Sequence, residues 1–231
     1  GQVRSGKTTF MQIWQKNEDP SLEGLAIATD PETPWHRIMP QAPIMQLIAD
    51  GAQLASITKS LLRGDNDYVL LEEMRDAAAF SLALDITSTG TTRSKATIHD
   101  SDGLNIPYKM ASKIRERYGG HAKELIAQVF KNFDYVIELC QLPEDKGKKV
   151  MKGILEYDYD IENDRVLARR ICSYDFLQKC WHWNGSGIAS KIDKYPERKE
   201  EIKQMMEILD TLSAVHRLTG QTVIYPAYYK E

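Results

Sequence analysis

A glycine-rich segment with a lysine and a threonine at fixed spacing opens the chain. Its glycines let the backbone curl so that successive N–H groups point at one anion. A lysine and a hydroxyl at its end suit phosphate oxygens and Mg²⁺. The segment fits G-x-x-x-x-G-K-[ST] at every fixed position, as Gly1-Gln2-Val3-Arg4-Ser5-Gly6-Lys7-Thr8. We therefore predict a loop that binds the phosphates of ATP together with Mg²⁺.

Each polar residue at the end of this loop has an expected role. Lys7 reaches the β- and γ-phosphates, the Thr8 hydroxyl holds Mg²⁺, and Thr9 adds a contact near the α-phosphate. The apolar residues that follow recur at helical spacing, which predicts a helix whose positive N-terminal dipole faces the phosphates. They are Phe10, Met11, Ile13 and Trp14.

Two carboxylates follow a short apolar run, Tyr68 to Leu71, that is typical of a buried strand. In an ATPase with a phosphate loop, such an acid lies beside the loop and polarises water or joins the metal shell. We predict that Glu73 activates the attacking water and that Glu72 belongs to the metal shell. Taken alone, the pattern fits a plain strand end equally well.

Apolar strands alternate with amphipathic helices along the first 140 residues. This alternation predicts an α/β fold with a mainly parallel sheet between helices. The segment Trp35–Pro43, with two prolines, is expected to be a loop. The predicted strands are Leu25–Thr29, Tyr68–Leu71, Lys95–Ile98 and Tyr135–Leu139; the predicted helices are Ile44–Leu62, Met74–Asp85, Pro107–Arg117 and His121–Asn132.

The character of the sequence changes after residue 145, so we divide the chain into a core, 1–145, and an extension of the same domain, 146–231. Met151–Asp160 and Arg165–Ser173 predict a β-hairpin, and Trp181–Gly187 an aromatic loop. Glu197–Leu218 predicts an amphipathic helix. Its expected buried side consists of Ile202, Met205, Met206, Ile208, Leu209 and Leu212.

Composition and charge are those of an ordinary globular protein. The 231 residues are 42% hydrophobic and carry a net charge of −3, so nothing attracts nucleic acid or an anionic membrane globally. No apolar run approaches the ~20 residues of a membrane span. The three cysteines lack a C-x-x-C pair; Cys180 and His182 have no matching second pair, so we expect neither zinc nor disulfides.

Four segments, taken in order, resemble the motifs of the ATPase family that drives type II and type IV secretion, type IV and Flp-type pili, and conjugation. The phosphate loop comes first, and the others resemble an Asp box, an arginine-bearing acidic strand and a His box. They are Ala28–Glu32, Leu61–Asp76, and Thr89–Thr91 followed by Ala96–His99. The resemblance covers roughly residues 1 to 140, and the later hairpin is more loosely similar to the Flp-pilus and conjugation branch.

The resemblance implies a RecA-like core that hydrolyses ATP and moves its neighbours in a ring, normally a hexamer. By the same resemblance, Asp30 lies near the metal, His99 senses the γ-phosphate, and Arg63 and Arg75 stabilise charge. Implied partners are inner-membrane platform proteins, with the motor in the cytoplasm at the inner face of the membrane. Because the sequence begins inside its first motif, we expect a fragment that lacks an N-terminal domain and the strand ahead of Gly1.

Three positions depart from the family pattern: Thr29, Glu72 and Thr91 stand where Glu, Gly and His are usual. These departures keep open a non-hydrolysing protein that uses ATP only to stabilise an assembly. A hexameric DNA translocase or helicase on the same core is a second alternative. Such a motor requires basic and aromatic residues that face a channel. The sequence has two basic clusters, which are explained more simply as solvent-exposed faces of the hairpin: Lys146, Lys148, Lys149 and Lys152, and Arg169 with Arg170.

Overall fold

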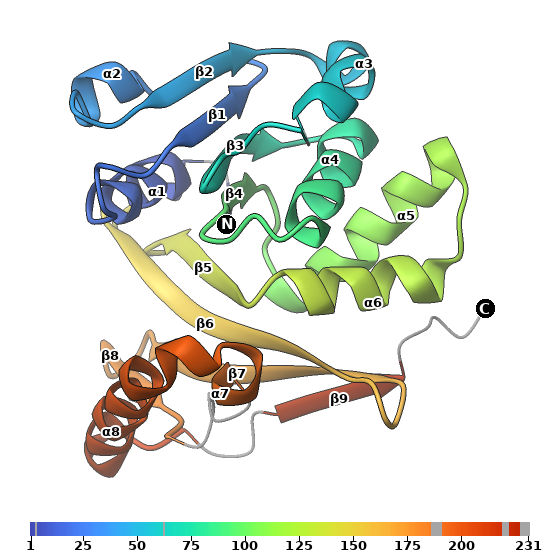
Figure 1. Cartoon of the computed structure of the whole chain (residues 1–231). Helices are drawn as coiled ribbons and strands as arrows, with labels where there is room; N and C mark the ends of the chain where they lie inside the picture. The colour runs from blue at the N-terminus through green and yellow to red at the C-terminus, as the bar shows by residue number, and fades with distance from the viewer. Residues whose placement is uncertain (3, 62, 186–190, 219–221, 227–231) are drawn as a thin grey trace.

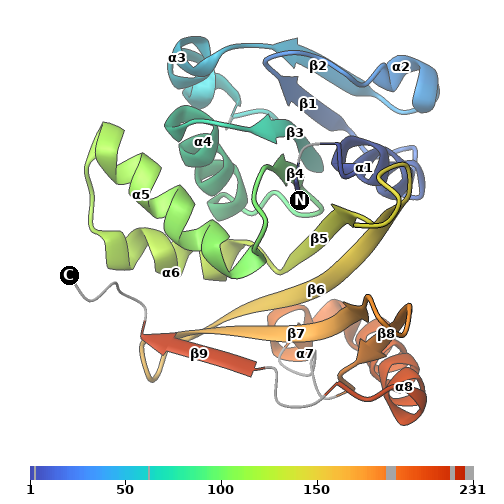
Figure 2. The same ribbon diagram turned by 180° about the vertical axis from the view of Figure 1, so that it is seen from behind.

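The chain folds as a mixed α/β structure built on two sheets (Figures 1 and 2). It is described from a computed structural model that covers residues 1–2, 4–61, 63–185, 191–218 and 222–226. A parallel sheet has the order β2-β1-β3-β4, and an antiparallel sheet has the order β5-β6-β7-β8 with β9 beside β7. The strands are β1 Gly24–Ala28, β2 Ile44–Ile48, β3 Tyr68–Met74, β4 Lys95–Ile98, β5 Tyr135–Gln141, β6 Lys149–Asp160, β7 Arg165–Asp175, β8 Cys180–Trp183 and β9 Thr222–Pro226.

Helices cover the parallel sheet on both faces, as the alternation of elements predicts. Among the helices of the described residues, none is both long enough and apolar enough to cross a lipid bilayer. The helices are α1 Lys7–Lys16, α2 Trp35–Ile38, α3 Gly51–Leu61, α4 Ala77–Ser88, α5 Ile106–Tyr118, α6 Ala122–Asn132, α7 Lys191–Lys194 and α8 Lys199–Val215, with 3₁₀ turns at Gly103–Asn105 and Pro196–Arg198.

Strand β3 divides the core because its side chains alternate between the two faces of the sheet. Tyr68 and Leu70 pack with Met11 of α1 and Trp35 of α2. The side chains that alternate with them face the larger core, which also contains buried residues of α4, α5, α6, β6 and β7. The antiparallel sheet thus shares one core with the helices of the parallel sheet.

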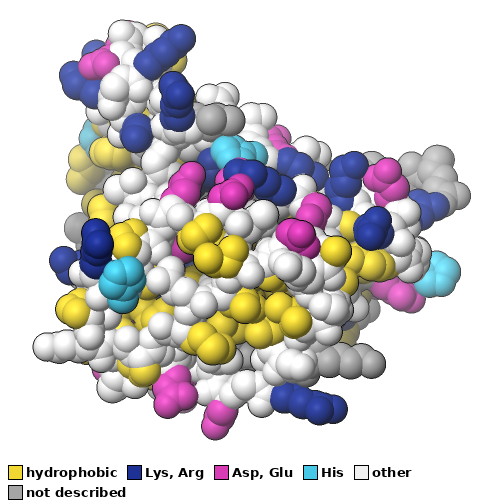
Figure 3. Space-filling model, turned by 90° about the horizontal axis from the view of Figure 1, so that it is seen from above, with side chains coloured by type: hydrophobic (Ala, Val, Ile, Leu, Met, Phe, Trp, Pro, Cys, Tyr) yellow, Lys and Arg dark blue, Asp and Glu magenta, His cyan; other side chains and the backbone are white. Residues whose placement is uncertain are grey.

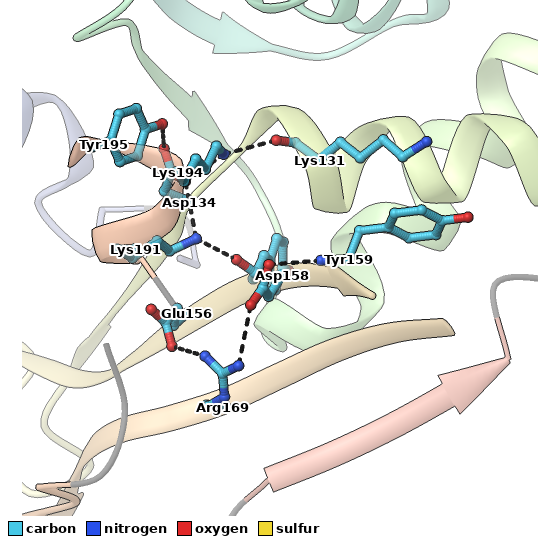
Figure 4. A network of polar contacts seen from close by, with 10 residues as sticks. Lys131, Asp134, Glu156, Asp158, Tyr159, Arg169, Lys191, Lys194 and Tyr195 are labelled. Carbon is cyan, nitrogen blue, oxygen red and sulfur yellow. Dashed lines mark hydrogen bonds and ion pairs between the residues drawn. The ribbon is translucent and has the colours of Figure 1, made fainter. Parts of the chain in front are cut away.

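A network of polar contacts fastens α7 to this shared core (Figure 4). Asp134, just before β5, accepts hydrogen bonds from Lys191 at 3.0 Å, from Lys194 at 2.7 Å and from the Tyr195 hydroxyl at 2.7 Å. Lys191 also donates to the main-chain carbonyl of Tyr157 at 2.8 Å, and its side chain is only 4% exposed. Because each charge has a partner, the chain can bury these groups.

Strand β2 is the outer edge of the parallel sheet, and its Met45 and Ile48 side chains are 57% and 63% exposed. Seen from above, with β2 toward the viewer, hydrophobic side chains gather across the middle of this face and charged side chains lie along its border (Figure 3). An apolar edge strand of this kind is a place where another polypeptide can pack.

The predicted long helix over Ile44–Leu62 is wrong. Its first part is strand β2, and the helix α3 begins only at Gly51. Asp50 makes the break, because its carboxylate accepts the N–H groups of Ala52 and Gln53 at 3.0 Å each, as a helix N-cap does. The apolar spacing of the two segments is similar, so periodicity alone predicted one long helix where the structure has a short strand and a capped helix.

Smaller differences follow from local pairing. Trp35–Pro43 contains the short helix α2, and the predicted aromatic loop begins with β8, which pairs with β7. Residues 186 and 187 of that loop lie outside the described residues.

Strand β5 pairs antiparallel with β6, because the connection between them has too few residues for a parallel crossover. On α8, Met205 and Ile208 are exposed, and the packed residues are Ile202, Met206 and Leu209.

Candidate active site

The phosphate loop curls into the first turn of α1 as its sequence predicts. Gly6 caps the helix with a φ of 88°, a left-handed conformation that glycine adopts without strain. Beneath the loop, the Ser5 hydroxyl is buried, with no hydrogen-bond partner among the described residues. Gln2 accepts a hydrogen bond from the Lys7 ammonium at 3.0 Å. Val3 lies outside the described residues.

Lys95, a buried residue of β4, holds helix α1 in place over the sheet. Its ammonium donates to Gln15 at 2.9 Å and to Glu18 at 2.8 Å, both near the end of α1. This anchoring fixes the start of α1 near the carboxyl end of β4, where His99 follows directly. The loop and the His box thereby meet at one edge of the sheet.

Lys7, His99 and Glu73 form a chain of polar contacts. The Lys7 ammonium lies 3.1 Å from Nδ1 of His99, and Nε2 of His99 lies 2.5 Å from a carboxylate oxygen of Glu73. An ammonium can only donate, so Nδ1 accepts and the proton sits on Nε2, which donates to Glu73. Burial, together with the charge of Lys7, lowers the pKa of His99 below its ordinary value, which favours the neutral ring that this hydrogen-bond geometry requires.

Glu73 is held in a strained position. Its φ is 60°, and the pairing of β3 with β4 shifts register between Leu71 and Met74, as at a β-bulge. Its N–H donates to the Thr97 hydroxyl at 2.9 Å. The bulge turns its carboxylate toward His99, and non-glycine residues at positive φ gather at functional sites. A hydrogen bond from Arg75 holds the pKa of Glu73 below its usual range.

Glu72, the other acid at this strand end, is turned into the protein. It follows Tyr68 and Leu70 in the alternation of β3, so it faces α2. One carboxylate oxygen accepts the Trp35 indole N–H at 2.7 Å, and the other accepts the main-chain N–H of Glu32 at 3.3 Å. Burial raises the pKa of Glu72, although these hydrogen bonds oppose the shift.

Glu32 is the carboxylate that the structure places beside the loop's threonine. The Thr8 hydroxyl donates to it at 3.2 Å. Sequence reasoning placed Glu32 inside the Asp box without a role. The signal that could have found it is its position two residues after Asp30, in the connection that leaves the carboxyl end of β1.

The remaining predicted residues lie at the margin of this cluster or away from it. Asp30 is exposed and its carboxylate lies 3.7 Å from the Arg75 guanidinium, which places both next to Glu73. Thr9 is exposed on α1, and Arg4 is exposed in the loop with a φ of 59°. Arg63 is exposed in the turn after α3, and none of its recorded contacts joins it to the site. The structure brings Asp30 and Arg75, but not Arg63, to the predicted centre.

A cavity of about 150 Å³ lies between the parallel and antiparallel sheets, next to Gly1. Residues of β4, including Ala96 and Ile98, line one side, and residues of β5, including Val136 and Ile137, line the other. The cavity therefore opens next to the start of the phosphate loop.

Comparisons with known proteins find relatives for part of this chain. No family model matches the sequence. The chain is 32% identical over 158 residues to the type IV secretion system protein VirB11 of Bartonella quintana (strain Toulouse), and 28% identical over the same length to VirB11 of Bartonella henselae. Each match covers 64% of this chain and 43% of the relative, so the chain spans less than half the length of the curated relatives it matches.

Two solved structures share the fold at 19% identity. The VirB11 ATPase of the Brucella suis type IV secretion system, solved with sulphate, matches with a TM-score of 0.59 over 68% of this chain and 46% of its own. The Legionella pneumophila ATPase DotB matches with a TM-score of 0.54 over 70% of this chain and 44% of its own. The chain is therefore similar in sequence to part of VirB11 and shares its fold with the VirB11 and DotB ATPases over about two thirds of its length.

Proposed function

We propose that this chain binds and hydrolyses ATP as the motor part of a type IV secretion ATPase. The observation that carries the proposal is the contact chain from Lys7 through His99 to Glu73, which joins the phosphate loop to the acidic strand end. The relatives support the same activity, because they are named as VirB11 secretion proteins and as ATPases. Phosphoryl transfer needs mainly positioning and charge stabilisation, which such a cluster supplies.

The loop residues fit a triphosphate. In the described part of the chain the buried Ser5 hydroxyl has no partner, and the first turn of α1 leaves its N–H groups free of helix bonds, so both suit phosphate oxygens. Lys7 would bind the terminal phosphates. A bound Mg²⁺ would neutralise phosphate charge. We propose that Thr8 and the adjacent Glu32 would hold this ion, with the exposed Asp30 nearby. Both carboxylate oxygens of Glu72 already accept hydrogen bonds from the protein. The metal role predicted for Glu72 therefore has no support from these contacts and stays a prediction.

Glu73 would orient the attacking water rather than act as a strong base. A general base works best with a pKa near the working pH, and Arg75 holds the pKa of Glu73 below its usual range. The lowered pKa favours the ionised carboxylate, which can accept a hydrogen bond from water and stabilise positive charge that develops on it. His99, neutral and donating to Glu73, would fix its direction.

The wider setting is proposed from the family. We propose that the protein acts as a ring, with inner-membrane platform proteins as partners, on the cytoplasmic side of the membrane. The type IV secretion relatives support a secretion setting, and the predicted similarity to the Flp-pilus branch stays a prediction. No particular feature of the described residues favours a DNA translocase.

Phosphate release from ATP tests the proposal. Glu73→Gln should abolish release while ATP affinity stays unchanged, because the carboxylate acts on water and not on the phosphates. Glu116→Gln, on the exposed surface of α5, is the matched control and should release phosphate at the wild-type rate. If Glu73→Gln releases phosphate as fast as wild type, the assigned role is wrong; if the wild type binds ATP but releases none, the non-hydrolysing alternative holds instead.

A further inference from the structure

Lys149 opens strand β6 at the point where the β5–β6 hairpin passes over the phosphate loop. A methyl group placed on Gly6 would lie 3.0 Å from Cδ of Lys149 and 4.0 Å from its Nζ. Its cross-strand partner, Gln141, donates from Nε2 to the main-chain carbonyl of Arg4 at 3.2 Å. Both strands of the hairpin therefore contact the loop, and the Lys149 ammonium lies beside the glycine that caps α1.

Lys149 brings a second ammonium group to the positive end of α1. The N-terminus of α1 carries the positive end of the helix dipole, and Lys7 is its first residue. Within the described part of the chain, no carboxylate forms an ion pair with Lys149, whereas the adjacent Lys148 pairs with Asp145 at 3.5 Å. The nearby acids have other partners: Glu32 accepts from Thr8, and Glu73 accepts from His99 and Arg75. A polyanion bound at the N-terminus of α1 would therefore be attracted by the helix dipole, by Lys7 and by Lys149.

We propose that Lys149 binds the phosphate chain of the nucleotide as a second cation beside Lys7. The inference rests on the proposed function and adds a residue from the antiparallel sheet to that site. A lysine ammonium acts as a point charge with three rotatable donors, so it suits phosphate oxygens without selecting a base. Lys149 is a binding residue for polyphosphates as a class, whether ATP, ADP or inorganic tripolyphosphate.

The test is the affinity of the purified chain for ATP and for tripolyphosphate, measured by calorimetry at low and at physiological ionic strength. Lys149→Ala should weaken the binding of both ligands by about two- to fivefold, as expected for loss of one exposed, solvent-screened ion contact. The loss should shrink as salt rises, because an exposed charge is screened. Lys149→Arg should keep most of the affinity.

The control variant is Lys148→Ala, which removes an equal charge from the next position, and circular dichroism checks that all variants fold. Equal affinities for Lys149→Ala and Lys148→Ala would overturn the inference and leave the proposed function standing. Absence of binding of either ligand to the wild type would instead overturn the proposed function, and the role of Lys149 with it. A loss seen with ATP but not with tripolyphosphate would also overturn the inference, since it would mean that Lys149 contacts the nucleoside.

Discussion

Two acids, Asp134 before β5 and Glu73 in β3, are paired in different ways. Asp134 accepts from Lys191, Lys194 and Tyr195 and ties α7 to the core. Burial would raise the pKa of Asp134, but the charges of Lys191 and Lys194 outweigh it and hold that pKa below its usual range. Glu73 has partners too, yet it sits on a strained bulge and contacts the loop through half-exposed side chains.

The charges around Asp134 stabilise the fold, whereas the charges around the phosphate loop are arranged to bind a ligand. Around Asp134, cations and acceptors match, and Lys191 is almost fully buried. At the loop, Lys149 has no ion-pair partner among the described residues, and the buried Ser5 hydroxyl has no hydrogen-bond partner among them. Mutations in the first region should change folding, and mutations in the second should change binding.

The largest expected effect breaks the Asp134 network. Asp134→Ala leaves the buried Lys191 without its counter-charge, and breaking a largely buried pair should lower the free energy of unfolding by about 2 to 3 kcal/mol. Urea denaturation measures the change, and Asp193→Ala, exposed on α7, is the control. ATP affinity under native conditions should not change. A loss of less than 0.5 kcal/mol, or roughly the error of such a measurement, would mean that the network contributes little to stability.

The next prediction separates the two acids near Thr8. Glu32→Gln should raise the Mg²⁺ concentration needed for half-maximal ATP binding by about tenfold, as loss of a metal-supporting carboxylate does. Glu72→Gln should raise it less, because Trp35 and the Glu32 amide already occupy the Glu72 carboxylate. Titration of Mg²⁺ into the chain with a fluorescent ATP measures both. A larger effect for Glu72→Gln would restore the role predicted for it from the sequence.

The smallest effect is a change in titration at His99. Burial and then the positive charge of Lys7 lower the pKa of His99. Lys7→Ala removes one of these causes and leaves the Glu73 carboxylate, which favours the protonated ring, so the pKa of His99 should rise. Nuclear magnetic resonance of the ring protons against pH measures it, with Lys148→Ala as the control. An unchanged or lower pKa in Lys7→Ala would show that the two side chains are not in contact in solution.

Local patterns predicted the parts of this fold that depend on neighbours in sequence. The phosphate loop, the strand that begins at Tyr68 and the hairpin of β6 and β7 each have a turn, an apolar period or a cap that can be seen in the sequence. The helix predicted over Ile44–Leu62 failed because a short edge strand and a helix share similar apolar spacing, and only the cap at Asp50 divides them.

Contacts that depend on distant segments could not be predicted. That Glu72 faces Trp35 while Glu73 faces His99 follows from the pleat and a bulge that depends on β4. That Lys149 lies over Gly6 follows from an antiparallel sheet packed against the helices of a parallel one. A single sequence carries no signal for either pairing.

Calorimetric titration of ATP with Mg²⁺ into the wild-type chain and into Lys7→Ala tests the central claim most directly. The wild-type chain should bind one ATP per chain, with a titration curve that saturates. Lys7→Ala should weaken it by about 10- to 100-fold, since a hydrogen bond to a charged group is worth about 1.5 to 3 kcal/mol. Equal binding by both proteins, or none by the folded wild type, would contradict the claim that this loop holds a nucleotide.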